Sequence, residues 1–166
     1  MLLALVILLG GCGVIKESTP PIPDLNFTGN ISVTYNNFDM NCKIENIIAD
    51  KCIVSVIEPE LLSGLTMTLK EGICTFNLGD VSYEIDSSFA ENVEFLSVFT
   101  ESVKKILNSA EYEKLENGNW LYTGMSDWGK FLLVQDKTSG YPVSFRIPEA
   151  GLSITFSNMK SIDNGG

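Results

Sequence analysis

Apolar and polar residues alternate with a period of two in one segment after another of this 166-residue chain. Successive side chains of a β-strand point to opposite faces, so this alternation is typical of strands with one apolar and one polar face. It predicts a many-stranded antiparallel sheet with one wet face. The clearest segments are 30–36, 38–45, 65–70, 81–86, 143–147 and 152–157.

Short turn signals separate these segments. They are Glu71-Gly72, Gly79-Asp80, Asn117-Gly118 and Ser139-Gly140. Asn-Gly favours positive φ at both central positions of a type I′ turn, so the third signal predicts a β-hairpin with that turn. Residues 59–62, which begin with proline and are followed by Ser63-Gly64, predict one short helical turn instead.

One long segment, residues 89–110, has helical rather than strand spacing. Its apolar stripe consists of Leu96, Phe99, Val103, Ile106, Leu107 and Ala110. Residues 88–91 fit the capping box that satisfies backbone N–H groups at a helix start. The chain is therefore predicted to be mainly β with one long α-helix, with about ten strands around that helix.

The width of that helix constrains the sheet. A helix of roughly 20 residues covers about 30 Å in length but only about 10 Å in width, so the sheet must curl to cover its apolar face. We therefore expect an unclosed antiparallel half-barrel wrapped around the helix, an α+β fold. The space between helix and sheet is a candidate ligand cavity, and the alternative is a core filled by its own side chains.

Aromatic residues are the candidates for lining this concave side. An apolar pocket with few polar contacts suits an acyl chain or another hydrophobic ligand. Trp128 follows Ser126-Asp127 and precedes Gly129 in a predicted turn, where it would lie at the rim. The candidate ligand-binding residues are Phe95, Phe99, Trp120, Tyr122, Trp128 and Phe131, with Tyr83 and Phe145 on the same predicted face.

Residues 1–12 form an uncharged, almost wholly aliphatic run that ends in Leu9-Gly10-Gly11-Cys12. Small residues before a cysteine, behind a short apolar core, resemble the bacterial lipobox cut by lipoprotein signal peptidase. The resemblance implies that 1–11 is a signal peptide and that Cys12 is lipidated. No Lys or Arg precedes Lys16, which a translation start placed too late would explain. The alternative is an apolar tail with a chance cysteine.

Residues 13–26 are rich in Gly, Pro and Ser, and proline favours extended backbone. We expect 12–26 to be the lipidated cysteine and a spacer, 27–162 the folded domain and 163–166 a flexible tail. Two acyl chains suffice for stable anchoring, so the expected location is extracytoplasmic, on the cell membrane. The candidate partners are a lipid or acyl-chain ligand and another envelope protein.

Charge and missing residue types exclude several functions. The chain contains 11 Lys and Arg residues and 21 Asp and Glu residues, which gives a net charge of -10. Binding to nucleic acid is therefore not expected. The chain has no histidine, which removes Ser-His-Asp catalysis and His-containing metal sites. We expect no cofactor, no metal and no enzymatic activity. The minor alternative is a hydrolase that uses carboxylates alone, from Glu58 and Glu60 or from Glu84 and Asp86.

If Cys12 is acylated, Cys42, Cys52 and Cys74 remain, an odd number that leaves at least one free thiol. Cys42 and Cys52 flank a turn expected near Ile47, so a disulfide across that hairpin is one hypothesis. The alternative is that all three are small buried apolar residues.

Three stretches, 27–33, 58–65 and 140–145, resemble the LolA/LolB/LppX-type lipoprotein carrier superfamily, especially its small Gram-positive lipoprotein members. The resemblance spans about residues 27–162 and implies an unclosed barrel of around eleven antiparallel strands with a cavity for acyl chains. It implies no catalytic residues. The resulting hypothesis is a membrane-anchored envelope lipoprotein that binds a hydrophobic ligand, with a carrier role as its extension. The alternative is a non-catalytic envelope scaffold with a filled core.

Overall fold

The computed structural model describes residues 20, 23–35, 38–48, 51–86 and 94–162. Within them, one antiparallel sheet of 11 strands has the order β6-β5-β4-β3-β2-β1-β11-β10-β9-β8-β7. The strands are β1 (Phe27–Tyr35), β2 (Phe38–Ile47), β3 (Lys51–Glu58), β4 (Thr66–Lys70), β5 (Ile73–Leu78), β6 (Val81–Asp86), β7 (Glu111–Lys114), β8 (Trp120–Ser126), β9 (Gly129–Gln135), β10 (Pro142–Ile147) and β11 (Leu152–Ser161).

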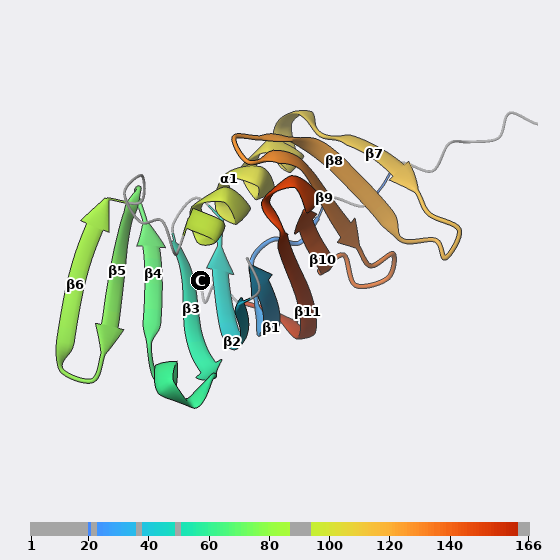
Figure 1. The fold of residues 1–166 in the computed structure, drawn as a ribbon. Coiled ribbons are helices and arrows are strands. Elements are labelled where there is room, and N and C mark those ends of the chain that lie inside the picture. The colour runs from blue at the N-terminus through green and yellow to red at the C-terminus, as the bar shows by residue number, and fades with distance from the viewer. Residues whose placement is uncertain (1–19, 21–22, 36–37, 49–50, 87–93, 163–166) are drawn as a thin grey trace, which may run out of the picture.

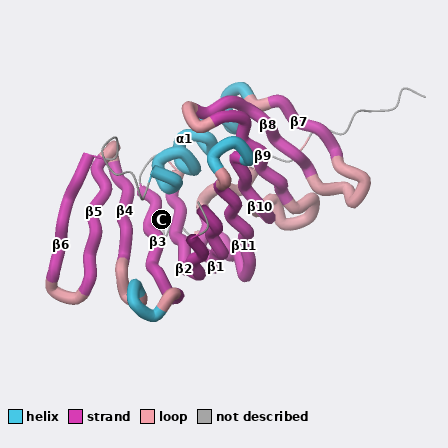
Figure 2. Tube along the Cα trace, viewed as in Figure 1, coloured by secondary structure: helices cyan, strands magenta, loops and turns pink. Residues whose placement is uncertain are grey.

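The single long helix of the described part, α1 (Glu94–Ser109), lies on the concave side of the curved sheet (Figures 1 and 2). In the strand order β6 and β7 stand at opposite ends, so the sheet is an unclosed half-barrel. The predicted fold class is thereby confirmed. The capping box at 88–91, the signal peptide at 1–11, Cys12 and the tail at 163–166 lie outside the described residues.

Alternation places one face of every central strand in a common core with the helix stripe. Leu96, Phe99, Val103 and Ile106 of α1 are all buried, as the helical spacing predicts. Leu107 is 42% exposed, so its assignment to the buried stripe was wrong. One residue corresponds to about 100° of helix rotation, which carries Leu107 from the buried side of Ile106 towards solvent.

In the described part of the chain, two-residue turns join β4 to β5, β5 to β6 and β8 to β9, and longer loops join other neighbouring strands. Gly118 has a positive φ of 86° and Asn117 does not, so the hairpin is present but the predicted type I′ turn is wrong. A backbone hydrogen bond from Gly118 to Leu115 closes a longer loop there, and Lys114 pairs with Trp120. Among the described hairpin turns, both central residues have positive φ only at Glu71-Gly72, the geometry of type I′.

The packed part of the chain begins before β1. Leu25 is buried, and its carbonyl accepts a hydrogen bond of 2.6 Å from Asn46 Nδ2. The Asn26 side chain accepts one from the Ile48 backbone. Further along the chain, the predicted helical turn after Pro59 is the 3-10 helix η1 (Glu60–Leu62), and a second, η3 (Pro148–Ala150), precedes β11. The bonds from Asn46 and Ile48 tie the N-terminal approach to the β2–β3 hairpin.

Candidate functional site

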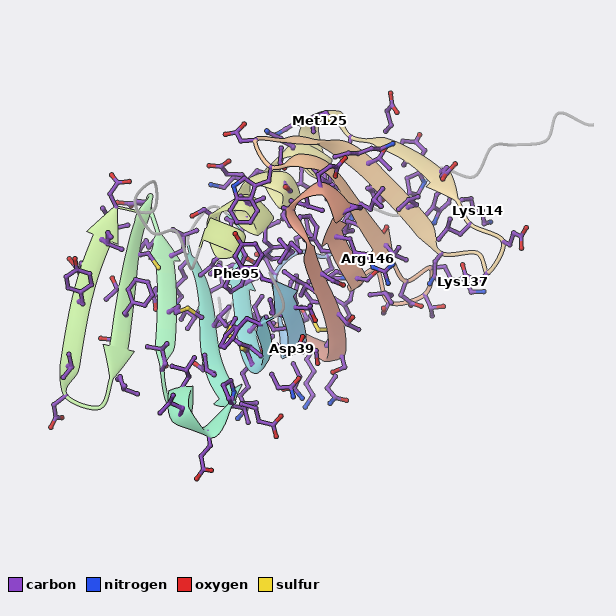
Figure 3. The ribbon with its side chains drawn as sticks, viewed as in Figure 1. Asp39, Phe95, Lys114, Met125, Lys137 and Arg146 are labelled. Carbon is purple, nitrogen blue, oxygen red and sulfur yellow. The ribbon has the colours of Figure 1, made fainter. Side chains whose placement is uncertain are left out.

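The aromatic residues predicted to line a ligand site are buried in the common core of helix and sheet, apart from the partly buried Trp128. Figure 3 shows Phe95 between the helix and the sheet. Phe95, Phe99, Trp120, Tyr122 and Phe131 are all at most 6% exposed. Phe99 contacts Phe145 edge to face at a centroid distance of 5.3 Å and Phe156 at 5.7 Å. Phe131 stacks on Phe145 at 6.1 Å. These rings fill the space between helix and sheet with one another.

The polar end of this cluster is hydrogen-bonded within the protein. Tyr122 Oη donates to Gln135 Oε1 at 2.9 Å, and Gln135 Nε2 donates to the Gly140 carbonyl at 3.0 Å. Burial, with a smaller contribution from nearby Tyr112, raises the pKa of Tyr122 to about 12. The buried amide thus joins β8 to the β9–β10 turn, and the cluster presents no ionised group at neutral pH.

Trp128 takes a different position from the other predicted residues. It lies in the β8–β9 turn, partly buried, and its ring stacks on Tyr35 with centroids 5.4 Å apart and planes 14° apart. Its backbone N–H donates to Ser126 Oγ at 3.3 Å, which fixes the turn. Trp128 therefore lies in the turn between two strands that the sequence predicts, and Tyr35 at the end of β1 is the partner that the sequence did not indicate.

Inner-face side chains become exposed at the end of the sheet that is formed by β5 and β6. Inner-face side chains are buried in β3, where Cys52 and Val54 are fully buried, and in β4, but several are exposed in β5 and β6. In β5, Phe76 is partly buried and Leu78 is 47% exposed. In β6, Tyr83 is 63% and Val81 is 70% exposed. We call Phe76, Leu78, Val81, Tyr83 and Ile85 the open wing.

The open wing is exposed because α1 does not extend over it. In Figure 1 the helix lies over the middle of the sheet and towards β8, while β5 and β6 form the far end. The register puts Phe76 opposite Tyr83 and Leu78 opposite Val81, so these side chains share one face. An apolar face formed by one strand pair, contiguous with a closed core, is a surface to which a hydrophobic ligand can bind.

The three described cysteines are free and buried, so the disulfide hypothesis was wrong. Cys42 pairs with Val56 and Cys52 with Asn46, because the hairpin turn lies beyond Ile47. The two thiols are therefore four positions out of register, about 13 Å along the strands, and a disulfide needs Cα atoms within about 7 Å. Burial raises the pKa of Cys42 to about 11 and of Cys52 to about 12.

The carboxylates considered for hydrolysis lie on the outer, polar face. An open groove of about 600 Å³ there is lined by Asp39, Glu58 and Glu60 together with neighbouring polar residues of β1 and β2. Thr34 Oγ1 donates to Asp39 at 2.6 Å, and Asn41 Nδ2 donates to Glu58. Glu84, on β6, accepts from Thr75 Oγ1 at 3.4 Å. Asp39, Glu58 and Glu84 therefore take part in cross-strand hydrogen bonds of a solvated sheet face, and Glu60 lies in the 3-10 helix beside them.

Two features are absent from the described part of the chain. It contains no group of three or more Cys, Asp or Glu side chains placed to hold a metal ion. None of its helices is long and apolar enough to cross a membrane.

The comparisons with known proteins place this fold among solved structures. No protein-family model and no curated protein matches the chain. The chain superposes on an uncharacterized conserved protein from Thermus thermophilus with a TM-score of 0.54 and 12% sequence identity. The match covers 82% of this chain and 78% of that one. At this identity the likeness shows a shared fold.

Two other structures match with lower scores. A LolA superfamily protein, NE2245 from Nitrosomonas europaea, gives a TM-score of 0.43 at 13% identity, covering 82% of this chain and 86% of that one. A chain in the complex of the CwlD amidase from Clostridioides difficile with the GerS lipoprotein gives 0.44 at 12% identity, covering 86% and 87%.

Proposed function

We propose that this chain is a membrane-anchored envelope lipoprotein that binds a lipid or another hydrophobic ligand on the concave side of its half-barrel. The observation that carries the proposal is the open wing, where apolar side chains of β5 and β6 remain exposed beside a filled core. The lipobox-like sequence ending at Cys12 supports the anchor. Residues 12–26 would then hold the domain close to a membrane that supplies such ligands.

The open wing suits an acyl chain better than the space under α1 does. Phe99 and Phe131 are at most 1% exposed and packed on Phe145, so a ligand there would have to displace the helix. On the wing, a ligand would cover Leu78, Val81 and Tyr83 without breaking existing contacts. Affinity would come from apolar area removed from water, at about 25 cal/mol per Å².

The acidic surface limits the headgroup of such a ligand. The net charge is -10, and Asp80 and Glu84 flank the wing in sequence. A strongly anionic headgroup would be repelled, so a neutral or cationic headgroup that stays in solvent is favoured. We propose no catalytic step and no cofactor.

Lipid extraction tests this proposal. The full chain, expressed in a bacterial host, would be purified without denaturant and extracted with organic solvent, which leaves any acyl chain on Cys12 attached to the protein. We expect non-covalent lipid in the extract by mass spectrometry. Val81→Ser should retain about fivefold less lipid, because it removes apolar contact area. Ile73→Ser, in the same hairpin but on the outer face, is the matched control.

The second candidate function, an envelope scaffold or interaction module, is favoured by the filled core itself. Phe27, Phe99, Phe131 and Phe145 leave no apolar side of the cluster exposed, since each is at most 1% accessible. A lipid-free extract together with unsaturable binding of a fluorescent fatty acid would select this function over ligand binding.

A further inference from the structure

Strand β6 is the last strand at one end of the sheet in the described part of the chain. In the described part of the chain it pairs only with β5, over all six of its residues and without a register shift. The turn before it has positive φ at Gly79 alone, the geometry of a type II′ hairpin, which keeps both strands regular. Over residues 81–85, such an edge offers backbone N–H and C=O groups to another strand.

The opposite edge strand, β7, is less suited to pairing with an added strand. It is only four residues long. Two of its side chains lie against β8: Tyr112 packs on Trp120, and Lys114 Nζ lies 5.6 Å from the Trp120 ring centroid. Short edges bearing lysine are a common protection against pairing with other chains. Strand β6 contains neither Lys nor Pro.

The two faces of β6 differ in chemistry. Val81 and Tyr83 present exposed apolar side chains on the inner face, and Ser82 and Glu84 lie on the outer face. No Lys or Arg occurs anywhere from residue 71 to residue 103 of the sequence. An incoming strand would therefore meet apolar groups on one face and negative charge on the other.

We propose that β6 binds one added strand from another protein, an extended segment in which apolar and basic residues alternate. Its apolar side chains would extend the open wing, and its Lys or Arg side chains would lie beside Glu84, since opposite charges on neighbouring strands attract. A second copy of this chain fits less well, because its own edge strand is acidic and would bring like charges together.

This inference does not depend on lipid binding, because its bonds are backbone hydrogen bonds at the strand edge. The probe is a blocked synthetic peptide of alternating Lys and Val, matched in length to the six residues of β6. It would be titrated against the full chain in a nonionic detergent by fluorescence anisotropy. We expect saturable binding, weakened about tenfold by replacing every Lys with Glu or by N-methylating the peptide nitrogens of one edge.

Protein variants test the position of the added strand. Glu84→Lys should weaken peptide binding about fivefold, while Glu113→Lys, the same charge change on exposed β7, should stay within about twofold. Equal binding of the N-methylated peptide would overturn strand addition in favour of apolar adsorption. An equal loss of peptide affinity in Glu84→Lys and Glu113→Lys would overturn the assignment of the added strand to the β6 edge. A dimer in sedimentation that only Glu84→Lys dissociates would assign the edge to a second copy, which also overturns the proposal.

Discussion

Tyr83 lies directly opposite Phe76 in the β5–β6 hairpin, yet Phe76 packs against the core and Tyr83 is 63% exposed. Both side chains are on the inner face of the sheet. The closed core therefore ends within this hairpin, beyond Phe76 and Ile85, because a helix about 10 Å wide cannot cover the whole curved sheet. What the helix leaves uncovered is the surface to which we assign ligand binding.

The aromatic cluster under α1 should dominate stability. Phe99→Ala removes a ring that is 1% exposed and contacts Phe145 and Phe156, so we expect a loss of about 3–5 kcal/mol in the free energy of unfolding. Urea denaturation measures this loss. Leu61→Ala, at a residue that is 90% exposed, should change it by less than about 0.5 kcal/mol. Equal stability of the two variants would contradict the closed core.

The buried thiols make the fold sensitive to alkali. The pKa of Cys42 is raised from 9.0 to about 11 and that of Cys52 to about 12, both by burial. Above pH 9 the unfolded chain therefore loses thiol protons that the native state still holds, so a rise in pH favours unfolding. We expect the free energy of unfolding to fall by up to about 1.4 kcal/mol per pH unit for each thiol. Replacing both residues with alanine should flatten that fall, and an unchanged slope would rule out the thiols as its cause.

The hydroxyl of Tyr122 should contribute measurably to stability. Tyr122→Phe removes the 2.9 Å hydrogen bond to Gln135 Oε1 inside the core, with an expected cost of about 1–2 kcal/mol by chemical denaturation. The matched control is Tyr112→Phe, where the side chain is 52% exposed, and its effect should stay below about 0.5 kcal/mol. An equally large loss of stability in Tyr112→Phe would contradict a specific contribution from the hydrogen bond between Tyr122 and Gln135.

Lipidation at Cys12 predicts a single-residue requirement for membrane attachment. Expressed in a bacterial host, Cys12→Ala should move the protein out of the membrane fraction and abolish incorporation of labelled palmitate, because two acyl chains supply the anchoring energy. Fractionation and labelling measure both effects, with Cys42→Ala as the control that keeps the anchor. Equal labelling of Cys12→Ala and the parent would contradict lipidation at this residue.

Local periodicity was sufficient to predict the general architecture, the long helix and six of the strands, namely β1, β2, β4, β6, β10 and β11. The alternation over 38–45 and 152–157 corresponds to β2 and β11, and the stripe from Leu96 to Ile106 lies on α1. Both patterns repeat over several residues, so the loss of one position, as at Leu107, does not hide them. The strand order was not predicted from the sequence: consecutive strands pair as neighbours within β1–β6 and within β7–β11, and β1 pairs with β11.

The sequence could not show which apolar residues remain exposed. Val81, Tyr83 and Ile85 alternate with polar residues as regularly as Ile31 and Val33 do, yet only the second group is fully buried. The difference depends on where the helix crosses the sheet, which is a long-range packing property. For the same reason Phe95 and Phe131 were candidates for lining a cavity, although both are at most 1% exposed and Phe131 stacks on Phe145.

The error in the predicted register of Cys42 and Cys52 came from the position of the β2–β3 turn. The β2–β3 turn lies about two residues later than the Ile47 centre expected from the sequence, which moves Cys42 from a position near Cys52 to one opposite Val56. No single residue in that segment marks the turn as strongly as Gly79 marks the turn before β6.

Titration of the full chain with a fluorescent fatty acid tests ligand binding on the open wing most directly. We predict a saturable signal that is nearly independent of salt concentration, because no charge pair drives binding. Val81→Ser should weaken binding about fivefold and Ile73→Ser should leave it within about twofold, since only the first residue lies on the inner face. An unsaturable signal, or equal binding by both variants and the parent, would contradict a hydrophobic ligand site on β5 and β6.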